Sequence, residues 1–427
     1  MNLIFPKKCN FVQKRLVRVF YSFLVQCTWF LLGVVAKFNQ KIKYFVEGRK
    51  KTFLTLQENL PTSKEIIWMH AASLGEYEQG LPVLEALKKV RPNYYYLLTF
   101  FSPSGYEVKK DSTPADLVMY LPMDTQKKAR RFLDGIQPKI ALFIKYEIWP
   151  NYLSELQNRH VPTFLVSGIF SKRQVYFKWY GGFMRKALKA FDHFFVQEDN
   201  SKKLLDAVGC QNVTISGDTR FDRVHEILHQ ENFLDFMERF KGNSKCFVAG
   251  STWPEDEKIM LGFINSAQTD IKIVIAPHNI KVNHISSLQA AITKKSVLYS
   301  DVASEKVSEA EVLIIDTIGL LTKIYSYADM AYVGGGFSTG LHNTLEPAVF
   351  GIPVLIGPHY EGFYEAKELV SQKGIISISN QREFEGTIRQ LIEDDKFSAQ
   401  TGSHNTAYLL QKKGATQKVM EYLKPLI

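Results

Sequence analysis

The feature that most constrains the fold of this chain is an alternation of short, strongly apolar runs with longer amphipathic stretches. The alternation occurs in two series. The first series comprises Glu65–His70, Tyr94–Phe100, Leu117–Leu121, Ile140–Ile144, Thr163–Ser167 and His193–Gln197. The second comprises Lys245–Ala249, Ile271–Ala276, Val312–Asp316, Met330–Val333 and Val354–Ile356. Continuous apolar runs separated by helical stretches are typical of parallel strands with helices on both faces of the sheet.

A polar, helix-compatible stretch, Asp222–Asn243, separates the two series. A chain of 427 residues is also too long for one ordinary core, and about two domains are expected. We therefore predict an α/β chain with two Rossmann-like domains that face a cleft, where ligands bind at the carboxyl ends of the strands. The expected segments are an anchor at 1–45, a first domain at 46–222, a linker at 223–244, a second domain at 245–405, and a C-terminal helix at 406–427 that packs back, with its last helical stretch at about Thr406–Leu423.

The N-terminal region carries a second constraint. No charged residue lies between Val19 and Ala36, a run of roughly 18 residues, and a helix needs about 20 apolar residues to span a bilayer. No small-residue cleavage site of a signal peptide follows the run. Basic residues flank it on both sides: Lys14, Arg15, Arg18, Lys37, Lys41 and Lys43. We predict a membrane-anchor helix that either spans the bilayer or lies in its interface, with a buried core helix as the alternative.

Overall charge and cysteine spacing limit the classes of partner and site. The formal net charge of +10 favours anionic partners such as nucleic acid, anionic lipid head groups or phosphorylated substrates. The four cysteines are scattered, without a CxxC pair or a metal-type Cys/His spacing. The sequence therefore predicts neither a disulfide framework nor a metal site.

Two polar clusters in the first half follow predicted strands. His70-Ala-Ala-Ser73-Leu-Gly75-Glu76 lies between a strand and a helix, where free backbone N–H groups gather. Glu76 would accept a proton from an attacking hydroxyl there, although on spacing alone a first-turn acid favoured by the helix dipole is the simpler interpretation. Lys145 and Glu147 precede the helix that Pro150 opens, and they either pair with each other or meet a polar substrate in the cleft.

Glycine-rich turns dominate the second half. Gly250-Ser251-Thr252 repeats the strand–turn–helix plan, and its amides suit either a phosphate or an ordinary helix cap. Gly334-Gly335-Gly336 follows a predicted strand and permits close approach of the backbone to a ligand. A helix expected to start near His342 would direct its amides at a phosphate, and Glu346 would accept hydrogen bonds from a ribose diol. This pattern suits a nucleotide-sugar donor, with a structural glycine turn as the alternative.

Together, these clusters resemble the Kdo transferases, enzymes with the two-domain glycosyltransferase B fold. The shared features cover nearly the whole chain. In chain order they are the apolar anchor, HAASLGE from His70, E-x-W-P-N at Glu147–Asn151, GSTWPEDE from Gly250, and GGGF…HNTLEPAVFGIPVLIGP from Gly334. Each motif alone is weak, whereas their order and spacing together are specific.

The resemblance implies roles for individual residues. Glu76 matches the general base of the family, and Asn343 and Glu346 match the motif that binds the CMP moiety. The residues expected to bind the acceptor are Ser73, Gly75, Lys145 and Glu147. The residues expected to contact the rest of the donor are Ser251, Pro277, His278, Gly334, Gly335 and Gly336. His278 stands where family members often carry an arginine, and a neutral imidazole supplies fewer hydrogen-bond donors than a guanidinium.

The resemblance also implies a reaction. Kdo, an acidic sugar, would be moved with inversion from CMP-Kdo to a lipid A precursor (lipid IVA), a step of lipopolysaccharide core biosynthesis, without a cofactor or bound metal. Residues 46–222 would bind the acceptor and residues 245–405 the donor. The partners would be these two substrates and the membrane, with no nucleic acid, at the cytoplasmic face of the bacterial inner membrane.

Three other functions fit part of this pattern. A glycosyltransferase of the same fold that uses a UDP-sugar would share the glycine loop and Glu346, but it has no reason to need HAASLGE. A nucleotide-sugar epimerase shares the two-domain fold but is usually soluble, so the run Val19–Ala36 argues against it. The third is a basic, membrane-associated binding protein with a degenerate cleft. Such a protein has no enzymatic activity, so a loss of activity in Glu76→Ala without a loss of folding would exclude it.

Overall fold

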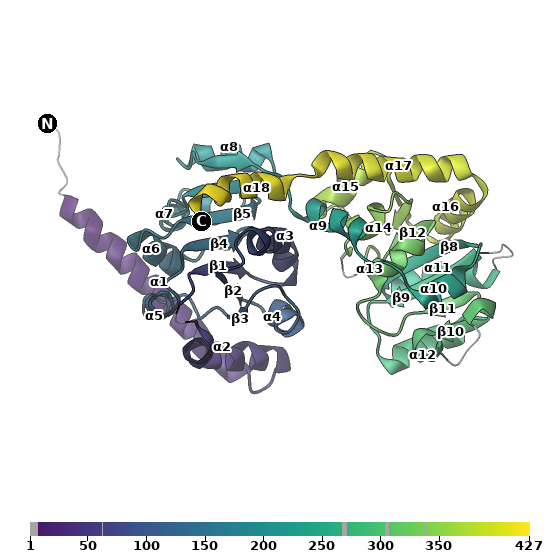
Figure 1. Cartoon of the computed structure of the whole chain (residues 1–427), viewed down its shortest axis with the longest axis horizontal. Coiled ribbons are helices and arrows are strands. Elements are labelled where there is room, and N and C mark those ends of the chain that lie inside the picture. Colours follow the sequence, from purple (N-terminus) through teal and green to yellow (C-terminus); the bar gives the residue numbers. More distant parts are fainter. Residues whose placement is uncertain (1–6, 62, 267–270, 304–306, 339) are drawn as a thin grey trace. The chain divides into compact units, whose positions relative to one another are not determined.

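The computed structural model describes residues 7–61, 63–266, 271–303, 307–338 and 340–427, with side chains from Val17 onward. The chain forms two compact units (Figure 1). Unit 1 comprises residues 1–223 and 414–427, and unit 2 comprises residues 224–413. Each unit is built on its own seven-stranded sheet of parallel strands, which confirms the predicted α/β class with two Rossmann-like domains.

The sheet of unit 1 has the strand order β3-β2-β1-β4-β5-β6-β7. Its strands are β1 (Ile66–Ala71), β2 (Tyr95–Phe100), β3 (Leu117–Tyr120), β4 (Ile140–Ile144), β5 (Thr163–Gly168), β6 (His193–Val196) and β7 (Val213–Ile215). Its helices are α1 (Lys7–Val35), α2 (Gln40–Asn59), α3 (Leu74–Val90), α4 (Pro103–Lys109), α5 (Gln126–Ile136), α6 (Pro150–Asn158), α7 (Gly182–Leu188), α8 (Asp199–Ala207) and α18 (Ala415–Leu423). Strands β1 to β6 coincide with the apolar runs of the first series.

Helices cover both faces of this sheet. On one face, α5, α6 and α7 pack over Trp68 and Phe143. On the other face, α3 and α18 pack over Met69 and Leu142. Successive residues of β1 and β4 therefore point to opposite cores. Burial on both faces explains why these strands are continuous apolar runs rather than alternating ones.

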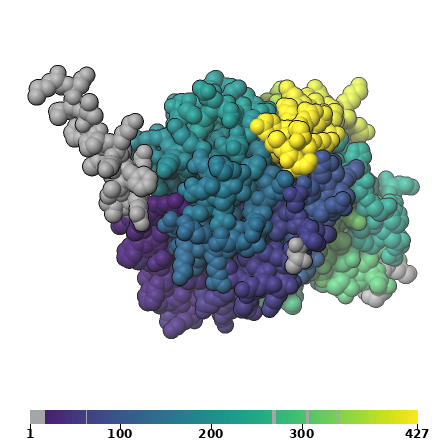
Figure 2. All heavy atoms as spheres, turned by 60° about the vertical axis from the view of Figure 1, so that its left-hand side comes forward, coloured from purple at the N-terminus to yellow at the C-terminus, as the bar shows by residue number. Residues whose placement is uncertain are grey.

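Helix α1 lies along the surface of unit 1 and is held there by polar side chains (Figures 1 and 2). Arg18 Nε donates a hydrogen bond to Asn151 Oδ1 at 2.8 Å, and the Tyr21 hydroxyl donates to Asp124 at 3.0 Å. The segment Val17–Val35 is long and apolar enough to cross a membrane, by length and composition, and none of it is buried. The structure thus contains an N-terminal helix suited to a membrane anchor.

Helix α2 is fixed to unit 1 by a buried arginine. Arg49 donates hydrogen bonds to the carbonyl oxygens of Leu121 (2.9 Å), Phe45 (3.1 Å) and Phe101. Burial lowers the pKa of Arg49 to about 9. The guanidinium carbon of Arg49 lies 3.6 Å from the centroid of the Phe45 ring. This ring and the three carbonyl groups offset the hydration that the buried guanidinium loses. Helix α2 is therefore part of the globular body of unit 1.

Unit 2 repeats the plan with the strand order β10-β11-β9-β8-β12-β13-β14. Its strands are β8 (Lys245–Thr252), β9 (Ile271–Pro277), β10 (Ser296–Leu298), β11 (Val312–Ile314), β12 (Met330–Val333), β13 (Val354–Ile356) and β14 (Ile375–Ser377). Its helices are α10 (Asp235–Lys241), α11 (Pro254–Ser266), α12 (Val282–Ala291), α13 (Leu321–Ile324), α14 (Leu345–Ala348), α15 (Tyr364–Ser371), α16 (Gln381–Glu393) and α17 (Asp395–Lys412), and α9 (Arg220–Glu226) crosses from unit 1. Helices α11, α12 and α16 cover one face, and α10 and α13 lie on the other.

The C-terminal stretch forms two helices where one was expected between Thr406 and Leu423. Helix α17 packs against α14, α15 and α16 of unit 2, whereas α18 packs against α3 of unit 1 (Figure 1). Gly414 separates them with a φ of +105°, a conformation that favours glycine. The Asp222 carboxylate accepts hydrogen bonds from the N–H groups of Gly414 and Thr416, both at 2.6 Å, and so fixes the start of α18.

Candidate functional site

Each sheet contains one point at which the strand order reverses. The strands that follow the first strand of the unit in sequence are added to the sheet on one side of it, and a later strand pairs with its other side. In unit 1 this point lies between β1 and β4, and in unit 2 it lies between β8 and β12. Open parallel sheets bind their ligands where the loops after two such strands diverge. Four of the predicted motifs lie at the carboxyl ends of these four strands. The motifs from His70 and Gly250 begin in the last residues of β1 and β8, and those from Lys145 and Gly334 directly follow β4 and β12.

Glu76 is the central carboxylate at the switch point of unit 1. It lies in the first turn of α3, and the residue is only 8% exposed. The Ser73 hydroxyl donates a hydrogen bond to Glu76 Oε2, and Lys145 Nζ lies 4.0 Å from Oε1. Strands β1 and β4 are neighbours, so the sheet brings together residues that are far apart in the sequence. Gly75 lies exposed in the same turn.

The first turn of α3 departs from ordinary helix capping. In a capping box, the side chain of the first residue accepts a hydrogen bond from the helix, and the acid three residues later binds the backbone of the first. Ser73 occupies the cap position, but its side chain caps no N–H group and donates to Glu76 instead. Ser73 and Glu76 therefore pair through their side chains instead of forming a capping box.

Lys145 pairs with Glu76 rather than with Glu147. Lys145 has a φ of +68°, and this left-handed turn separates it from the segment that follows. Glu147 Oε2 accepts a hydrogen bond from Trp149 Nε1 at 2.9 Å and lies 3.3 Å from Nε2 of the buried His70. Glu147 therefore ties the loop after β4 to the end of β1, and one of its oxygens is committed to that contact.

The glycine loop of unit 2 is packed between the end of β8, where Gly250-Ser251-Thr252 continues the strand instead of forming the expected turn, and the segment after β13. A Cβ atom on Gly334 would lie 2.2 Å from the carbonyl oxygen of Ser251, and one on Gly336 would lie 2.7 Å from Gly357 N. Ser251 itself has a φ of +54°, in the left-handed region. Backbone packing thus requires glycine at 334 and 336, because no larger residue fits without displacing a neighbouring chain segment.

Two amides of this loop are already used inside the protein. Gly334 N donates to Gly250 O at 2.9 Å, and Gly335 N donates to Asp256 Oδ2 at 2.9 Å. These two N–H groups are therefore not available to a ligand.

Asp256 joins the two loops of unit 2. Its side chain is fully buried and accepts three hydrogen bonds, from Trp253 N (2.9 Å), Gly335 N (2.9 Å) and the Tyr332 hydroxyl (2.6 Å). Burial raises the pKa of Asp256, and the three hydrogen bonds oppose that rise. The loop after β8 and the loop after β12 are thus held by one carboxylate.

Three aromatic rings form a stack beside these loops. The ring of His278, an exposed residue, lies 4.6 Å from the Trp253 ring with an interplanar angle of 23°, and 4.6 Å from the His342 ring. Trp253 Nε1 donates to His342 Nε2 at 3.1 Å, so Nε2 carries no proton. His278 N also donates to Thr252 O at 2.9 Å, which places His278, directly after the buried Pro277, next to the end of β8.

We expect the His342 ring to stay neutral down to about pH 4, because burial and the nearby His278 lower its pKa to about 4 from 6.5. The unfolded chain takes up this proton near 6.5. The stabilising contribution of neutral His342 is therefore present above that pH and lost as the pH falls toward 4. NMR titration of ¹³C-labelled histidine, assigned with His342→Gln, checks this. The His278→Gln variant should raise the pKa of His342, and titration of His342 near 6.5 in the native protein would contradict the assignment.

Asn343 and Glu346 meet at the start of α14. Asn343 Nδ2 donates to Glu346 Oε1 at 2.9 Å, and the Thr322 hydroxyl donates to Oε2 at 3.1 Å. The helix begins at Leu345 instead of near His342, and it is only four residues long. Glu346 is half-buried, and a carboxylate has further acceptor positions for a diol.

Asp256, His70 and Trp149 belong to the sequence motifs, but none of the three was predicted as a site residue. Asp256 had a recognisable signal, because an acid three residues after the cap position, here Trp253, is the second half of a capping box. The contact of His70 with Glu147 and Trp149 had none, because it depends on which strands are neighbours in the sheet.

Solved structures of other proteins share this architecture. The UDP-GlcNAc 2-epimerase of Neisseria meningitidis, bound to UDP-GlcNAc, has a TM-score of 0.60 and 15% identity, over 84% of this chain and all of that chain. MurG of Acinetobacter baumannii has a TM-score of 0.53 and 11% identity, over 85% of this chain and 99% of that chain. At such low identity these likenesses show the fold alone, which is the glycosyltransferase B type.

Proteins that are similar in sequence give more specific information about the family than these structures do. The 3-deoxy-D-manno-octulosonic acid transferase of Chlamydophila psittaci is 24% identical over 424 residues, which is 95% of this chain and 97% of that protein. The enzyme of the same name from Haemophilus influenzae is 25% identical, over 84% of this chain and 87% of that protein. A bifunctional glycosyltransferase/methyltransferase of Fusobacterium nucleatum is 28% identical over 83% of this chain, which spans only 57% of that longer protein.

The family model described as 3-deoxy-D-manno-octulosonic-acid transferase (kdotransferase) matches residues 44–223. These residues are unit 1 without α1 and α18, and they include the Ser73–Glu76 turn and Lys145. The family match, the relatives along nearly the whole chain and the two-unit fold agree with one another. The chain is a glycosyltransferase that is similar to the Kdo transferases, by the family model over residues 44–223 and by relatives along nearly its whole length.

Proposed function

We propose that this chain transfers Kdo from CMP-Kdo to a hydroxyl group of a lipid A precursor, with inversion at the anomeric carbon, as a step of lipopolysaccharide biosynthesis. The observation that carries the proposal is the carboxylate of Glu76 at the switch point of unit 1. It is buried, held by the Ser73 hydroxyl and lies 4.0 Å from the Lys145 ammonium. A carboxylate fixed in this way beside a substrate site is suited to accept a proton.

In the proposed reaction, the acceptor hydroxyl loses its proton to Glu76 as its oxygen attacks the anomeric carbon of Kdo. A new C–O bond forms on the face opposite the leaving group, and the bond between the anomeric carbon and the phosphate oxygen breaks. CMP leaves with that electron pair. Lys145 Nζ, 4.0 Å from Glu76 Oε1, is placed to fix the orientation of the carboxylate.

The donor half of the reaction is assigned to unit 2. Asn343 and Glu346 are proposed to bind the CMP moiety, since Glu346 is half-buried and Asn343 exposed at the start of α14. Ser251, Pro277 and His278, together with the glycine loop, are proposed to meet the phosphate and the carboxylate of the donor. The exposed imidazole of His278 lies next to the end of β8 and is suited to donate to an anionic oxygen.

The acceptor half is assigned to unit 1, at a membrane surface. Ser73, Gly75, Lys145 and Glu147 are proposed to contact the sugar that carries the attacking hydroxyl. The exposed apolar segment Val17–Val35 supports attachment to the membrane in which an acylated acceptor resides. The proposed location is the cytoplasmic face of the bacterial inner membrane, where a nucleotide-activated sugar is available.

The direct test is transfer of radiolabelled Kdo, activated as CMP-Kdo in situ, to a tetra-acylated lipid A precursor, using membranes that contain the full-length protein. We expect a labelled lipid that is more polar than the acceptor. Counting its Kdo residues gives the number of transfers, and NMR of the new linkage tests inversion. UDP-GlcNAc offered in parallel tests the two rival functions, since an epimerase or a UDP-sugar transferase would consume it. If no label moves while the folded protein still binds CMP, Kdo is not the sugar.

A further inference from the structure

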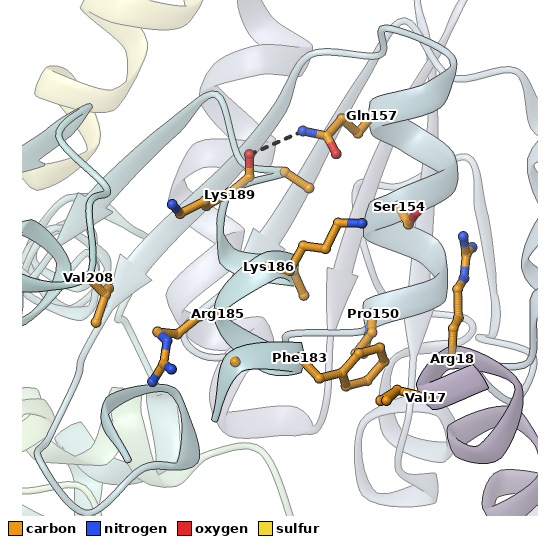
Figure 3. A pocket seen from close by; sticks show the side chains of 13 residues that line it. Val17, Arg18, Pro150, Ser154, Gln157, Phe183, Arg185, Lys186, Lys189 and Val208 are labelled. Carbon is orange, nitrogen blue, oxygen red and sulfur yellow. Dashed lines mark hydrogen bonds between the residues drawn. The ribbon is translucent and has the colours of Figure 1, made fainter. Parts of the chain in front are cut away.

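A groove of about 660 Å³ lies between α1, α6 and α7 of unit 1 (Figure 3). None of its lining residues is acidic, and four are basic: Arg18, Arg185, Lys186 and Lys189. Val17, Phe183 and Val208 supply apolar parts of its wall. A concave site that combines apolar walls with uncompensated positive charge suits a ligand that is both anionic and partly apolar.

Lys186 and Lys189 carry the charge that is available to a ligand. Both residues are exposed, and neither ammonium forms an ion pair among the residues that the structure describes. Figure 3 shows Lys186 extending from α7 toward Ser154 on α6, across the groove. Lys189 extends the other way, toward Val208, so the two ammonium groups lie at different parts of the groove and add to its positive potential.

The two arginines are engaged in the protein and shape the groove. Arg185 donates hydrogen bonds to the carbonyl oxygens of Tyr176 (3.1 Å) and Lys178 (2.6 Å). Arg18 pairs with Glu155 at 3.3 Å, which neutralises much of its charge. These contacts hold the walls of the groove, and the lysines remain as the groups that a ligand would meet.

The way α1 packs puts this groove at a membrane surface. One face of α1 contacts unit 1 through Arg18, Tyr21 and Trp29, and the Trp29 ring lies 4.7 Å from the Lys128 ammonium. The residues with large apolar side chains exposed elsewhere on α1 include Phe20, Phe23, Leu24, Phe30, Leu31 and Val34. A helix docked along a charged protein surface cannot cross the hydrocarbon upright without burying those charges, which is costly. Its geometry fits the plane of the interface, with the apolar face immersed.

We propose that this groove binds the phosphate-bearing head group of an anionic glycerophospholipid of the surrounding membrane. Lys186, which extends across the groove, would hold the phosphate, and Lys189 would add to the attraction for the anionic head group. The apolar wall around Phe183 would receive the start of an acyl chain. The choice of a bulk phospholipid over the sugar acceptor rests on position, because neither Glu76 nor Lys145 lines the groove. The inference rests on membrane attachment as proposed above, and it does not depend on which sugar is transferred.

The test measures binding of the full-length protein to vesicles of phosphatidylcholine with and without phosphatidylglycerol, by co-sedimentation. For the double variant Lys186→Gln/Lys189→Gln, we expect the gain in binding that phosphatidylglycerol causes to fall by about 30-fold, equivalent to about 1 kcal/mol for each basic residue. Binding to pure phosphatidylcholine should be unchanged, since α1 is intact. The matched control is Lys127→Gln/Arg131→Gln, which removes two charges from the groove on the other side of α1.

Two outcomes would overturn the proposal. If both double variants lost the same share of the binding gain caused by phosphatidylglycerol, the whole basic surface would attract the lipid. The groove would then not be a separate site. An unchanged response of Lys186→Gln/Lys189→Gln would exclude the lysines altogether. Transfer to the acceptor in detergent without phospholipid separates the two lipid sources. The variant should keep the KM of the native protein there, whereas a raised KM would assign the groove to the acceptor.

Discussion

Replacing Glu76 with glutamine is expected to lower the turnover number of Kdo transfer by about 10²–10⁴-fold, the usual contribution of a positioned general base. The free energy of unfolding should change little, because glutamine has the same shape and can still accept the hydrogen bond from Ser73. Binding of CMP should also be unchanged, since the residues assigned to it lie in unit 2. The measurement is a steady-state rate with both substrates saturating, together with a denaturant-unfolding curve.

A matched control lies two residues along the same helix. Glu78 pairs with Lys109 and Arg223 at 3.5 Å, at the surface, so Glu78→Gln should alter turnover less than about twofold. Retention of more than a tenth of native turnover by Glu76→Gln would remove Glu76 from the mechanism and leave it a structural acid.

The strands of this fold were predictable from sequence because most of them are buried on both faces. Two strands of unit 2 were not predicted, and both lie at the edges of its sheet: β10 (Ser296–Leu298) and β14 (Ile375–Ser377). Each is three residues long, and each is only partly buried. An edge strand has one neighbour and less cover, so its sequence needs no long apolar run. Hydrophobicity alone therefore cannot identify such strands.

The motifs were predictable as loops after strands, but the contacts among them were not. Sequence spacing leaves Lys145 free to pair with Glu147, two residues away, or with a partner elsewhere. The structure pairs it with Glu76, because β1 and β4 are neighbours. Parallel strands are joined by long crossovers, so no local turn signal states which strands are adjacent. Strand order, and with it the composition of the site, comes from packing over the whole unit.

The N-terminal helix shows a related limit. The apolar run Val19–Ala36 predicts affinity for a membrane, but not the direction in which the helix lies. That direction depends on Tyr21 and Ser22, which meet Asp124 and Asn151 from other parts of unit 1. Polar residues within an apolar run have meaning only when their partners are known.

Asp256→Ala is expected to give the largest loss of stability in unit 2, a decrease of about 3 kcal/mol in the free energy of unfolding. The substitution leaves two backbone N–H groups, of Trp253 and Gly335, and the Tyr332 hydroxyl without their buried acceptor. Both loops at the switch point of unit 2 would lose their common support. Affinity for CMP should therefore fall together with stability, and calorimetric titration with CMP and thermal unfolding of the full-length protein measure the two effects.

Two further variants separate the role of Asp256 from general damage to the core. In Asp256→Asn, the amide oxygen can still accept from Trp253 N and Gly335 N, and its NH₂ group can donate to the Tyr332 hydroxyl. This variant should recover most of the CMP affinity. Tyr332→Phe removes one hydrogen bond and should cost about 1 kcal/mol of stability while leaving CMP affinity near that of the native protein. If Asp256→Ala lowered stability but bound CMP normally, the carboxylate would stabilise the core of unit 2 and have no part in shaping the CMP site. The loops would then keep their shape without it, because the glycine packing between Ser251 and Gly357 would suffice.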